Sequence, residues 1–214
     1  MKNRRQGQSR LLTNDEIKRV VQFQKSSRHS IRNICLVNMS IYLGMRVGEI
    51  AQLKMGDVVN EDLSIKEQVV LRKEYTKTNQ TRVVYLVHKD VRKSLTDYIN
   101  YRKECDGNVK SNPFLQNMKK YLAKPLFVSQ KQSGFSPRTL QRLYKNMYRA
   151  VIGDEMVSSH SGRRTFITNL ISSGIDMKTV SVLAGHSSIQ TTVDTYAVAN
   201  PNKMVNVCRN ISIN

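Results

Sequence analysis

The chain has 214 residues, 39% of them hydrophobic, which is enough for one good-sized packed domain or two small ones and argues against a disordered chain. Its 35 Lys and Arg residues outnumber 16 Asp and Glu, and the formal net charge of +19 is spread along the sequence rather than gathered in one tail. This surplus favours a polyanionic partner, nucleic acid first and an anionic membrane surface second, over a merely soluble basic protein.

Cysteine spacing and apolar runs narrow the class of protein further. The three cysteines are far apart and form no Cys-x-x-Cys pair, so they indicate ordinary thiols in a reducing compartment and no zinc site. The basic start MKNRRQGQSR has no apolar stretch and is therefore not a signal peptide. No run approaches the ~18–20 apolar residues of a membrane span. We expect a soluble cytoplasmic protein that does not bind membranes.

The first part of the chain is predicted to be helical. Residues 1–12 are expected to form a basic arm or linker, and the capping box TNDE at 13–16 starts a helix that runs to about residue 23. The apolar period of residues 31–43 predicts a buried helix. A glycine turn and a short helix follow, with an exit at Gly56-Asp57.

The hydrophobic period then changes. Residues 63–72 and 81–87 are rich in β-forming residues and are joined by the polar stretch KEYTKTNQ, which predicts a hairpin with a lysine-bearing turn. Helical patterns return at 89–103, 136–152, 160–174 and 176–186, whereas 111–127 is irregular. We expect a mainly α fold with a small antiparallel β-sheet, in one domain over 13–214 with a C-terminal tail from about residue 198.

Three local patterns contain residues able to bind an anion. Arg46 and Glu49 are three apart and share a helical face, as members of a surface ion pair also do. His160 and Arg163 are three apart at a helix start, where the helix dipole favours negative charge. Gly185-His186 sets a histidine on an exposed turn, where it would bind a phosphate or cap the preceding helix.

A tyrosine follows ten residues after that histidine, in the polar run AGHSSIQTTVDTYAVA. Threonines and an aspartate precede Tyr196 instead of the apolar neighbours of a core tyrosine. Either this side chain packs on the surface with no special role, or its hydroxyl performs the chemistry.

The order of these patterns resembles that of the tyrosine recombinases, the phage integrase family of site-specific DNA recombinases. The stretches that carry the resemblance cover the catalytic domain nearly end to end and are YLGMRVGEIAQLKMGDV, YTKTNQTRVVYL and SSHSGRRTFITNLISSGIDMKTVSVLAGHSSIQTTVDTYA. The resemblance implies the tyrosine recombinase catalytic-domain fold. It also implies cutting and rejoining of DNA through a 3′-phosphotyrosyl intermediate, in integration, excision, inversion or resolution. The alternatives are DNA relaxation like that of a type IB topoisomerase, or a DNA-binding accessory relative.

The resemblance also assigns roles to single residues. The phosphate-binding arginines fall on Arg46 and Arg163, the hairpin lysine on Lys77, the two histidines on His160 and His186, the supporting acid on Glu49, and the nucleophile on Tyr196.

The chemistry requires these residue types. Two guanidiniums hold the non-bridging oxygens and stabilise the charge of the transition state. A tyrosine with a pKa of ~10 needs a base, which would be His160. The leaving 5′-oxygen needs a proton, which would come from Lys77, with Lys73 as the alternative. No metal and no cofactor is expected.

Further arginines are expected to contact the DNA. Arg138 and Arg142 would face phosphates along one helix, which in a sharper form of this hypothesis enters the major groove. Arg82 would contact DNA next to the hairpin, and Arg164 is either a phosphate contact or a solvated charge.

The resemblance extends to partners and location. It implies double-stranded DNA as the substrate and a homo-oligomer, namely a tetramer, assembled on that DNA. Accessory DNA-bending proteins are further candidate partners. It also implies a bacterial or phage-encoded, nucleoid-associated protein. Only about a dozen residues precede the first expected helix, where many family members have an all-helical clamp domain of about a hundred residues. The chain is therefore expected to be a fragment or to resemble the short members that consist of the catalytic domain.

Overall fold

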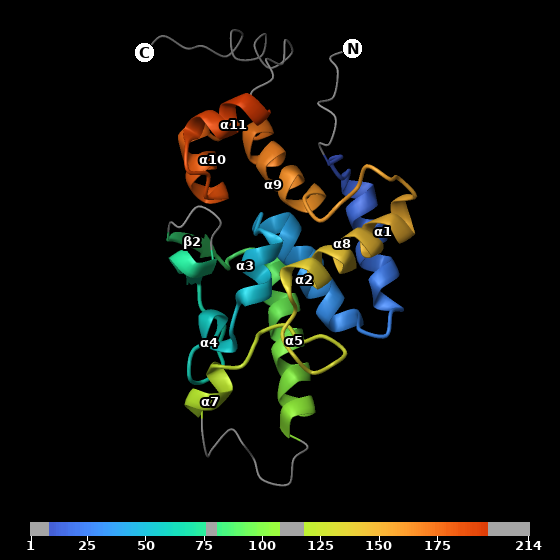
Figure 1. The fold of residues 1–214 in the computed structure, drawn as a ribbon, viewed down its shortest axis with the longest axis vertical. Coiled ribbons are helices and arrows are strands. Elements are labelled where there is room, and N and C mark those ends of the chain that lie inside the picture. The colour runs from blue at the N-terminus through green and yellow to red at the C-terminus, as the bar shows by residue number, and fades with distance from the viewer. Residues whose placement is uncertain (1–8, 76–80, 108–117, 197–214) are drawn as a thin grey trace.

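A computed structural model describes residues 9–75, 81–107 and 118–196 (Figure 1). These residues form a mainly helical fold with one small sheet, as the sequence predicts. The elements in chain order are α1 (Asn14–Lys25), α2 (Ser30–Tyr42), α3 (Val47–Gln52), α4 (Met55–Val58), β1 (Gln68–Leu71), the short 3₁₀ helix η1 (Lys73–Tyr75), β2 (Arg82–Tyr85), α5 (Lys89–Gly107), α7 (Met118–Leu122), α8 (Pro137–Ile152), α9 (Ser161–Ser172), α10 (Met177–Ala184) and α11 (Ile189–Tyr196).

Local sequence signals set the ends of several helices. The capping box of α1 is confirmed: Glu16 N–H donates to Thr13 Oγ1 at 3.2 Å, and Thr13 N–H donates to Glu16 Oε2 at 2.8 Å. Helix α8 begins after the cap Ser136 with a proline in its first turn and ends at Gly153, whose φ is 68°. These signals act within a few residues, so the sequence alone is enough to predict them.

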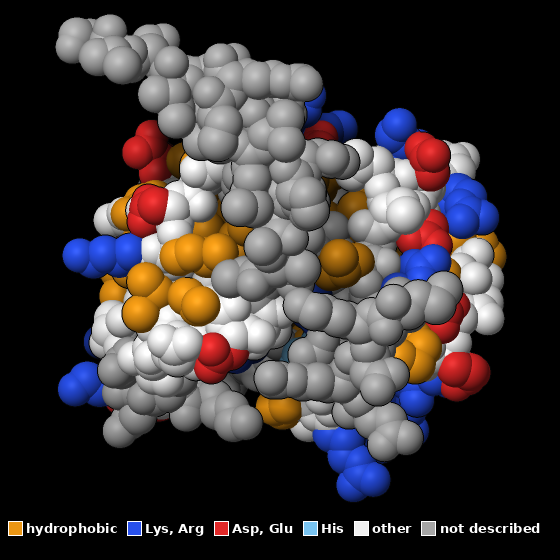
Figure 2. Space-filling view, turned by 90° about the horizontal axis from the view of Figure 1, so that it is seen from above, with side chains coloured by type: hydrophobic (Ala, Val, Ile, Leu, Met, Phe, Trp, Pro, Cys, Tyr) orange, Lys and Arg blue, Asp and Glu red, His pale blue; other side chains and the backbone are white. Residues whose placement is uncertain are grey.

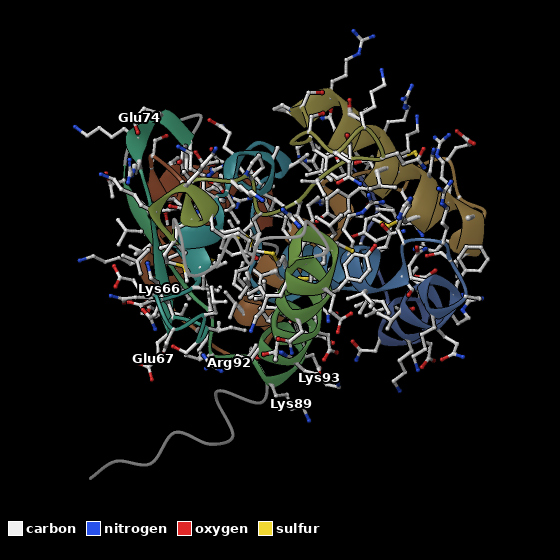
Figure 3. The ribbon with its side chains drawn as sticks, turned by 90° about the horizontal axis from the view of Figure 1, so that it is seen from below. Lys66, Glu67, Glu74, Lys89, Arg92 and Lys93 are labelled. Carbon is white, nitrogen blue, oxygen red and sulfur yellow. The ribbon has the colours of Figure 1, made fainter. Side chains whose placement is uncertain are left out.

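The hairpin predicted between residues 63 and 87 is confirmed as strands β1 and β2, which pair antiparallel. Its turn at 76–80 lies outside the described residues, and the predicted site residue Lys77 lies there with it. The sheet is tied to the first turn of α5 by Arg92, whose guanidinium donates to the carbonyls of Ile65, Lys66 and Leu86 at 3.3–3.4 Å (Figure 3).

Helix α2 lies at the centre of the core. It packs against α1, α5 and α9, and four of its apolar side chains, those of Cys35, Leu36, Val37 and Met39, have no solvent exposure. A second, smaller cluster joins α9 to α10 through Ile167, Val180 and Ala184. In Figure 1 helices α9, α10 and α11 form a layer above α2 and α3. The predicted site residues are divided between this layer and the elements below it.

The structure differs from the predictions in three places. Residues 9–12 pack on the body instead of forming an arm, because Leu12 is buried and Arg10 pairs with Glu16 and Asp154. The exit predicted at Gly56-Asp57 is instead the helical turn α4, which buries the side chains of its first and last residues. The stretch predicted to be irregular contains α7, which buries Tyr121.

Across the described ranges 9–75, 81–107 and 118–196, none of the helices combines the length and the apolar character needed to cross a membrane.

Candidate active site

Three arginines that are far apart in the sequence converge on the C-terminal end of α10. Arg82 Nη1 donates to the carbonyl of Leu183 at 2.7 Å and Arg163 Nη2 to that of Ala184 at 2.6 Å. Arg46 Nη2 donates to the carbonyl of Gly185 at 2.7 Å. Each of three consecutive carbonyls therefore accepts from a different guanidinium. We call Arg46, Arg82 and Arg163 the arginine cluster.

The end of α10 explains why cations gather there. The last carbonyls of a helix lack partners within the helix and carry the negative end of its dipole. Backbone N–H groups of Gly185 and His186 close the helix by donating to Val182 and Ser181. The next three carbonyls are left for the arginine cluster. Because Arg46 directly precedes α3 and Arg82 belongs to β2, this contact also joins the upper layer to the elements below it (Figure 1).

Gly185 is required here for two reasons. Its φ of 63° lies in the left-handed region that favours glycine. A Cβ at this position would also lie 2.2 Å from Cδ of Arg82, so a side chain would displace that arginine. The glycine before His186 therefore reflects both the helix end and the close approach of Arg82.

Glu49 is fully buried between two members of the arginine cluster. Its carboxylate accepts from Arg46 Nη1 at 2.9 Å, and from Arg82 Nε and Nη2 at 3.1 and 2.6 Å. Burial alone would raise the pKa of Glu49, but the hydrogen bonds and charges of Arg82 and then Arg46 outweigh it and leave the pKa below its usual value. The arginine cluster carries three positive charges against this one carboxylate, and the excess suits an anionic substrate.

Arg163 projects from the first turn of α9 and is 7% exposed. Besides Ala184, it donates to the carbonyl of Gly44 at 2.5 Å. The neighbouring Gly162 allows α9 to approach the core, because a Cβ there would lie 2.4 Å from Ser40 Oγ and 2.9 Å from Tyr148 Oη. A bulkier residue between His160 and Arg163 would therefore push the start of α9 outward.

His186 follows directly after the arginine cluster. Its Nδ1 lies 2.7 Å from Oγ1 of Thr192, which is fully buried on α11. Burial, followed by the charges of Arg163, Arg46 and Arg82, lowers the pKa of His186 to about 4. The ring is therefore neutral at pH 7 and carries one N–H.

Helix α11 is the short helix expected to carry the tyrosine, and it ends at Tyr196. It packs against α10 and α9, and the hydrogen bond between Thr192 and His186 fixes it beside the arginine cluster. Position 196 lies one helical turn after Thr192. The backbone of Tyr196 therefore lies one helical turn beyond the residue that contacts His186, and the tyrosine side chain is not among the described ones.

His160 lies in different surroundings, exposed at the residue before α9. It lines a surface depression of about 530 Å³ whose other wall is the basic side of α8, with Arg138, Arg142 and Lys145. The backbone N–H of His160 donates to Ser158 Oγ at 3.1 Å. His160 and Arg163, expected to share one anion, thus sit on the same helix start with contrasting exposure.

The four arginines predicted to contact DNA divide into two pairs. Arg138 and Arg142 are exposed along α8, as expected of phosphate-facing residues. Arg82 is 8% exposed and directed toward Glu49, and Arg164 donates to the carbonyl of Ser9. For Arg82 and Arg164 the structure describes internal contacts, and their predicted contact with DNA stays a prediction. Seen from above, Lys and Arg side chains lie around the rim of the molecule, with Asp and Glu among them (Figure 2).

The sequence did not predict the contacts that two residues of this site make, those of Arg82 with Glu49 and of Thr192 with His186. Arg82 lies on the same face of the chain as the buried residues Val84 and Leu86, since side chains of a strand alternate between its two faces. This alternation was the available signal that Arg82 points inward. Thr192 gives no such signal, because a threonine in a polar helix is ordinary. Among the side chains that the structure describes, no group of three His, Cys, Asp or Glu lies close enough to hold a metal.

Known proteins are similar to this chain over most of its length. A sequence model of the phage integrase family matches residues 10–203. Transposase A from transposon Tn554 of Staphylococcus aureus is 28% identical over 207 residues, covering 93% of this chain and 51% of that protein. Tyrosine recombinase XerC of Pediococcus pentosaceus is 27% identical over 173 residues, covering 79% of this chain and 51% of that protein. The chain thus spans about half the length of these curated relatives.

A solved structure shares the fold. The integrase of transposon Tn1549, in complex with a circular intermediate DNA, superposes with a TM-score of 0.72 at 16% identity, covering 99% of this chain and 68% of that one. Because the family match extends over most of the sequence, the chain belongs to the phage integrase family.

Proposed function

We propose that this chain is the catalytic part of a site-specific tyrosine recombinase that cuts and rejoins double-stranded DNA without a metal ion. The observation that carries the proposal is the arginine cluster on the three carbonyls before His186, next to a helix that ends at Tyr196. Membership of the phage integrase family favours strand exchange over DNA relaxation of the topoisomerase kind.

In this proposal the scissile phosphate binds at Arg46, Arg163 and His186. A guanidinium has five N–H donors, so an arginine is able to bind a carbonyl and a phosphate oxygen together. Glu49 and Arg82 keep Arg46 oriented, with Arg82 acting through Glu49. Two positive charges next to the phosphate would stabilise the additional negative charge of the transition state.

His186 would donate a hydrogen bond to a non-bridging oxygen. Its ring is neutral at pH 7, so only one of its two nitrogens carries a proton. If the hydroxyl of Thr192 donates to Nδ1, the proton lies on Nε2, which then faces the substrate. Thr192 would therefore select the tautomer that serves the reaction.

The covalent step uses the remaining residues. The Tyr196 oxygen attacks phosphorus, the P–O5′ bond breaks, and a 3′-phosphotyrosyl bond forms. His160 takes the phenolic proton, and Lys77 gives a proton to the departing 5′-oxygen. Attack by another 5′-hydroxyl reverses these steps on a new partner strand. Because the phosphotyrosyl bond retains the energy of the phosphodiester, no nucleotide cofactor is needed.

The exposed basic side of α8 would lie along the DNA. Arg138, Arg142 and Lys145 line the same depression as His160, so a phosphate backbone there would also reach the proposed base. A tetramer on DNA with accessory DNA-bending proteins would complete the reaction, since strand exchange needs four strands cut.

A nicked suicide DNA substrate tests this function. The nick lets the short leaving strand diffuse away, so a covalent protein–DNA adduct accumulates. We expect an adduct with the unaltered chain in the presence of EDTA, and none with Tyr196→Phe, which should still bind the DNA. An adduct that survives this substitution would assign the nucleophile to another residue.

A further inference from the structure

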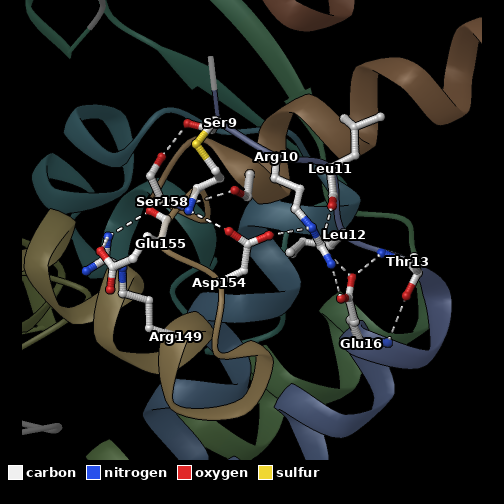
Figure 4. A network of polar contacts seen from close by, with 12 residues as sticks. Ser9, Arg10, Leu11, Leu12, Thr13, Glu16, Arg149, Asp154, Glu155 and Ser158 are labelled. Atoms are coloured by element: carbon white, nitrogen blue, oxygen red, sulfur yellow. Dashed lines mark hydrogen bonds and ion pairs between the residues drawn. The ribbon is translucent and has the colours of Figure 1, made fainter. Parts of the chain in front are cut away.

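Residues 9–12 cross the loop that leads to His160, and we call them the amino-terminal strap. Leu12 anchors the strap with a side chain that is 5% exposed, and its N–H donates to Thr165 Oγ1 at 2.9 Å. The N–H of Arg10 donates to the carbonyl of Met156 at 3.0 Å. The strap therefore lies on both α9 and the loop 153–160 (Figure 4).

Ser9 contacts the chain on both sides of His160. Its Oγ lies 2.5 Å from Oγ of Ser158, and that same oxygen accepts the backbone N–H of His160 at 3.1 Å. The carbonyl of Ser9 accepts from the guanidinium of Arg164. The backbone N–H of Arg164 in turn donates to the carbonyl of His160 at 2.9 Å. Two chains of hydrogen bonds thus run from Ser9 to the backbone of His160.

Arg10 fastens the strap through ion pairs. Its Nη1 donates to Glu16 Oε2 at 2.9 Å, and its Nε lies 2.9 Å from Asp154 Oδ2 (Figure 4). Glu16 belongs to the capping box of α1, and Asp154 accepts the N–H of Met156 at 2.7 Å inside the loop. Arg10 therefore links a fixed helix start to the loop that leads to the exposed histidine.

We propose that Ser9 and Arg10 are positioning residues that hold His160 in place for proton transfer, an inference that rests on the proposed function. His160 lies where the loop meets α9, and its backbone is bonded to Ser158 and Arg164, which the strap contacts. Proton transfer needs the base within hydrogen-bond reach of the attacking oxygen, so a small displacement lowers the rate. The strap would hold His160 in its orientation, as packing against neighbouring residues holds the buried arginines.

A double-mutant cycle separates positioning from general support of the fold. Single-turnover cleavage of the nicked substrate at saturating protein should slow about fivefold with Ser9→Ala and about tenfold with Arg10→Met, while DNA affinity stays the same. Ser9→Thr keeps the hydroxyl and should restore the rate. In a His160→Ala background neither strap substitution should change the remaining rate by more than about twofold, because the residue through which they act is gone.

Two matched substitutions outside the strap serve as controls. Ser26→Ala removes a serine hydroxyl that donates to Phe23 at the far end of α1, and Arg19→Met removes an exposed positive charge from the same helix. Both should cleave at the unaltered rate. Thermal unfolding of every variant sets an assay temperature at which each one is folded.

Hydrogen exchange gives a readout that does not depend on catalysis. The backbone N–H of His160 should exchange faster in Ser9→Ala than in Ser26→Ala. Unchanged exchange at His160, or equal slowing by the strap substitutions in both backgrounds, would overturn the positioning role. Absence of any adduct from the unaltered chain would instead remove the proposed function, so the two failures are distinguishable.

Discussion

The two histidines of the site occupy opposite surroundings. His186 is partly buried beside three arginines, with its ring bound to Thr192 and its pKa lowered to about 4. His160 is exposed at the end of a loop, beside the basic side of α8, and its backbone N–H donates to Ser158.

This difference separates the two tasks of the site. The half proposed to bind the phosphate is held in place by hydrogen bonds that join the arginine cluster to Glu49 and to the end of α10. The half with His160 depends on one loop and the strap across it. Substitutions in the first half should therefore damage the chemical step and the fold together, whereas those in the second should damage the rate more selectively.

The largest effect is expected from Arg46 and Arg163. Replacing either by Ala should reduce cleavage about 10²–10³-fold, because in the proposed function each stabilises transition-state charge. The double substitution should cost much less than the product of the two. A Lys replacement should not rescue either, since an ammonium lacks the planar fork. Single-turnover rates measure this, and fully multiplicative losses would contradict a shared phosphate.

Glu49→Gln should have the next largest effect. It removes a buried negative charge while keeping the shape, so Arg46 and Arg82 lose their common partner. We expect a loss of about 3 kcal/mol in the free energy of unfolding and a cleavage rate lower by at least tenfold. Urea unfolding measures the first, with the exposed Glu67→Gln as control. A variant as stable as that control would show that Glu49 does not organise the cluster.

Arg82 points inward to Glu49 and Arg138 is exposed on α8, so substituting each one tests whether the two arginines have different roles. Arg82→Met should slow cleavage about tenfold at saturating DNA with little change in affinity, because Arg82 acts through Glu49. Arg138→Met should lower affinity and reduce the slope of log K against log salt by about 1, with cleavage at saturation intact. Binding titrations at several salt concentrations check both. If Arg82→Met instead lowered DNA affinity and left cleavage at saturation intact, Arg82 would be a DNA contact.

The smallest effect concerns pH. His186 has a folded pKa of about 4 against 6.5 unfolded, so the unfolded chain binds the extra proton and stability falls as pH drops from 6.5 toward 4. Between pH 7 and 5 the ring should contribute a loss of about 1 kcal/mol, allowing for its partial exposure. Urea unfolding of the unaltered chain and of His186→Asn measures the difference. The lowered pKa values of His29 and Glu49 act in both chains and cancel.

Much of the fold was predictable because local signals determine it. The capping box at Thr13, the serine cap of α8 and the glycine at 185 each act within one turn, and strand alternation gave the hairpin. The helical turn α7 was missed, because it depends on burying Tyr121 against elements distant in sequence. The order of the motif residues singled out Arg46, Glu49, Arg163 and His186, which the structure brings together.

Other parts of the site required tertiary structure. That three arginines meet on carbonyls 183–185 depends on how α10 packs above α3 and β2, which no local pattern encodes. The role of Arg82 and the partner of His186 were hidden for the same reason. Ser9 and Arg10 were predicted to belong to a basic arm, because the partners that hold them on the loop, Ser158 and Asp154, lie about 150 residues away.

The proposed reaction depends most on Tyr196 as the nucleophile, and mass spectrometry of the trapped adduct tests this role most directly. Trypsin should release the peptide from Thr179 to Lys203, which contains Tyr196 as its single tyrosine. We predict that this peptide carries the phosphate-linked nucleotide remnant after nuclease digestion, and that the unmodified peptide is depleted in proportion to adduct formed. A remnant on a peptide that contains another tyrosine, with this peptide unmodified, would contradict the account.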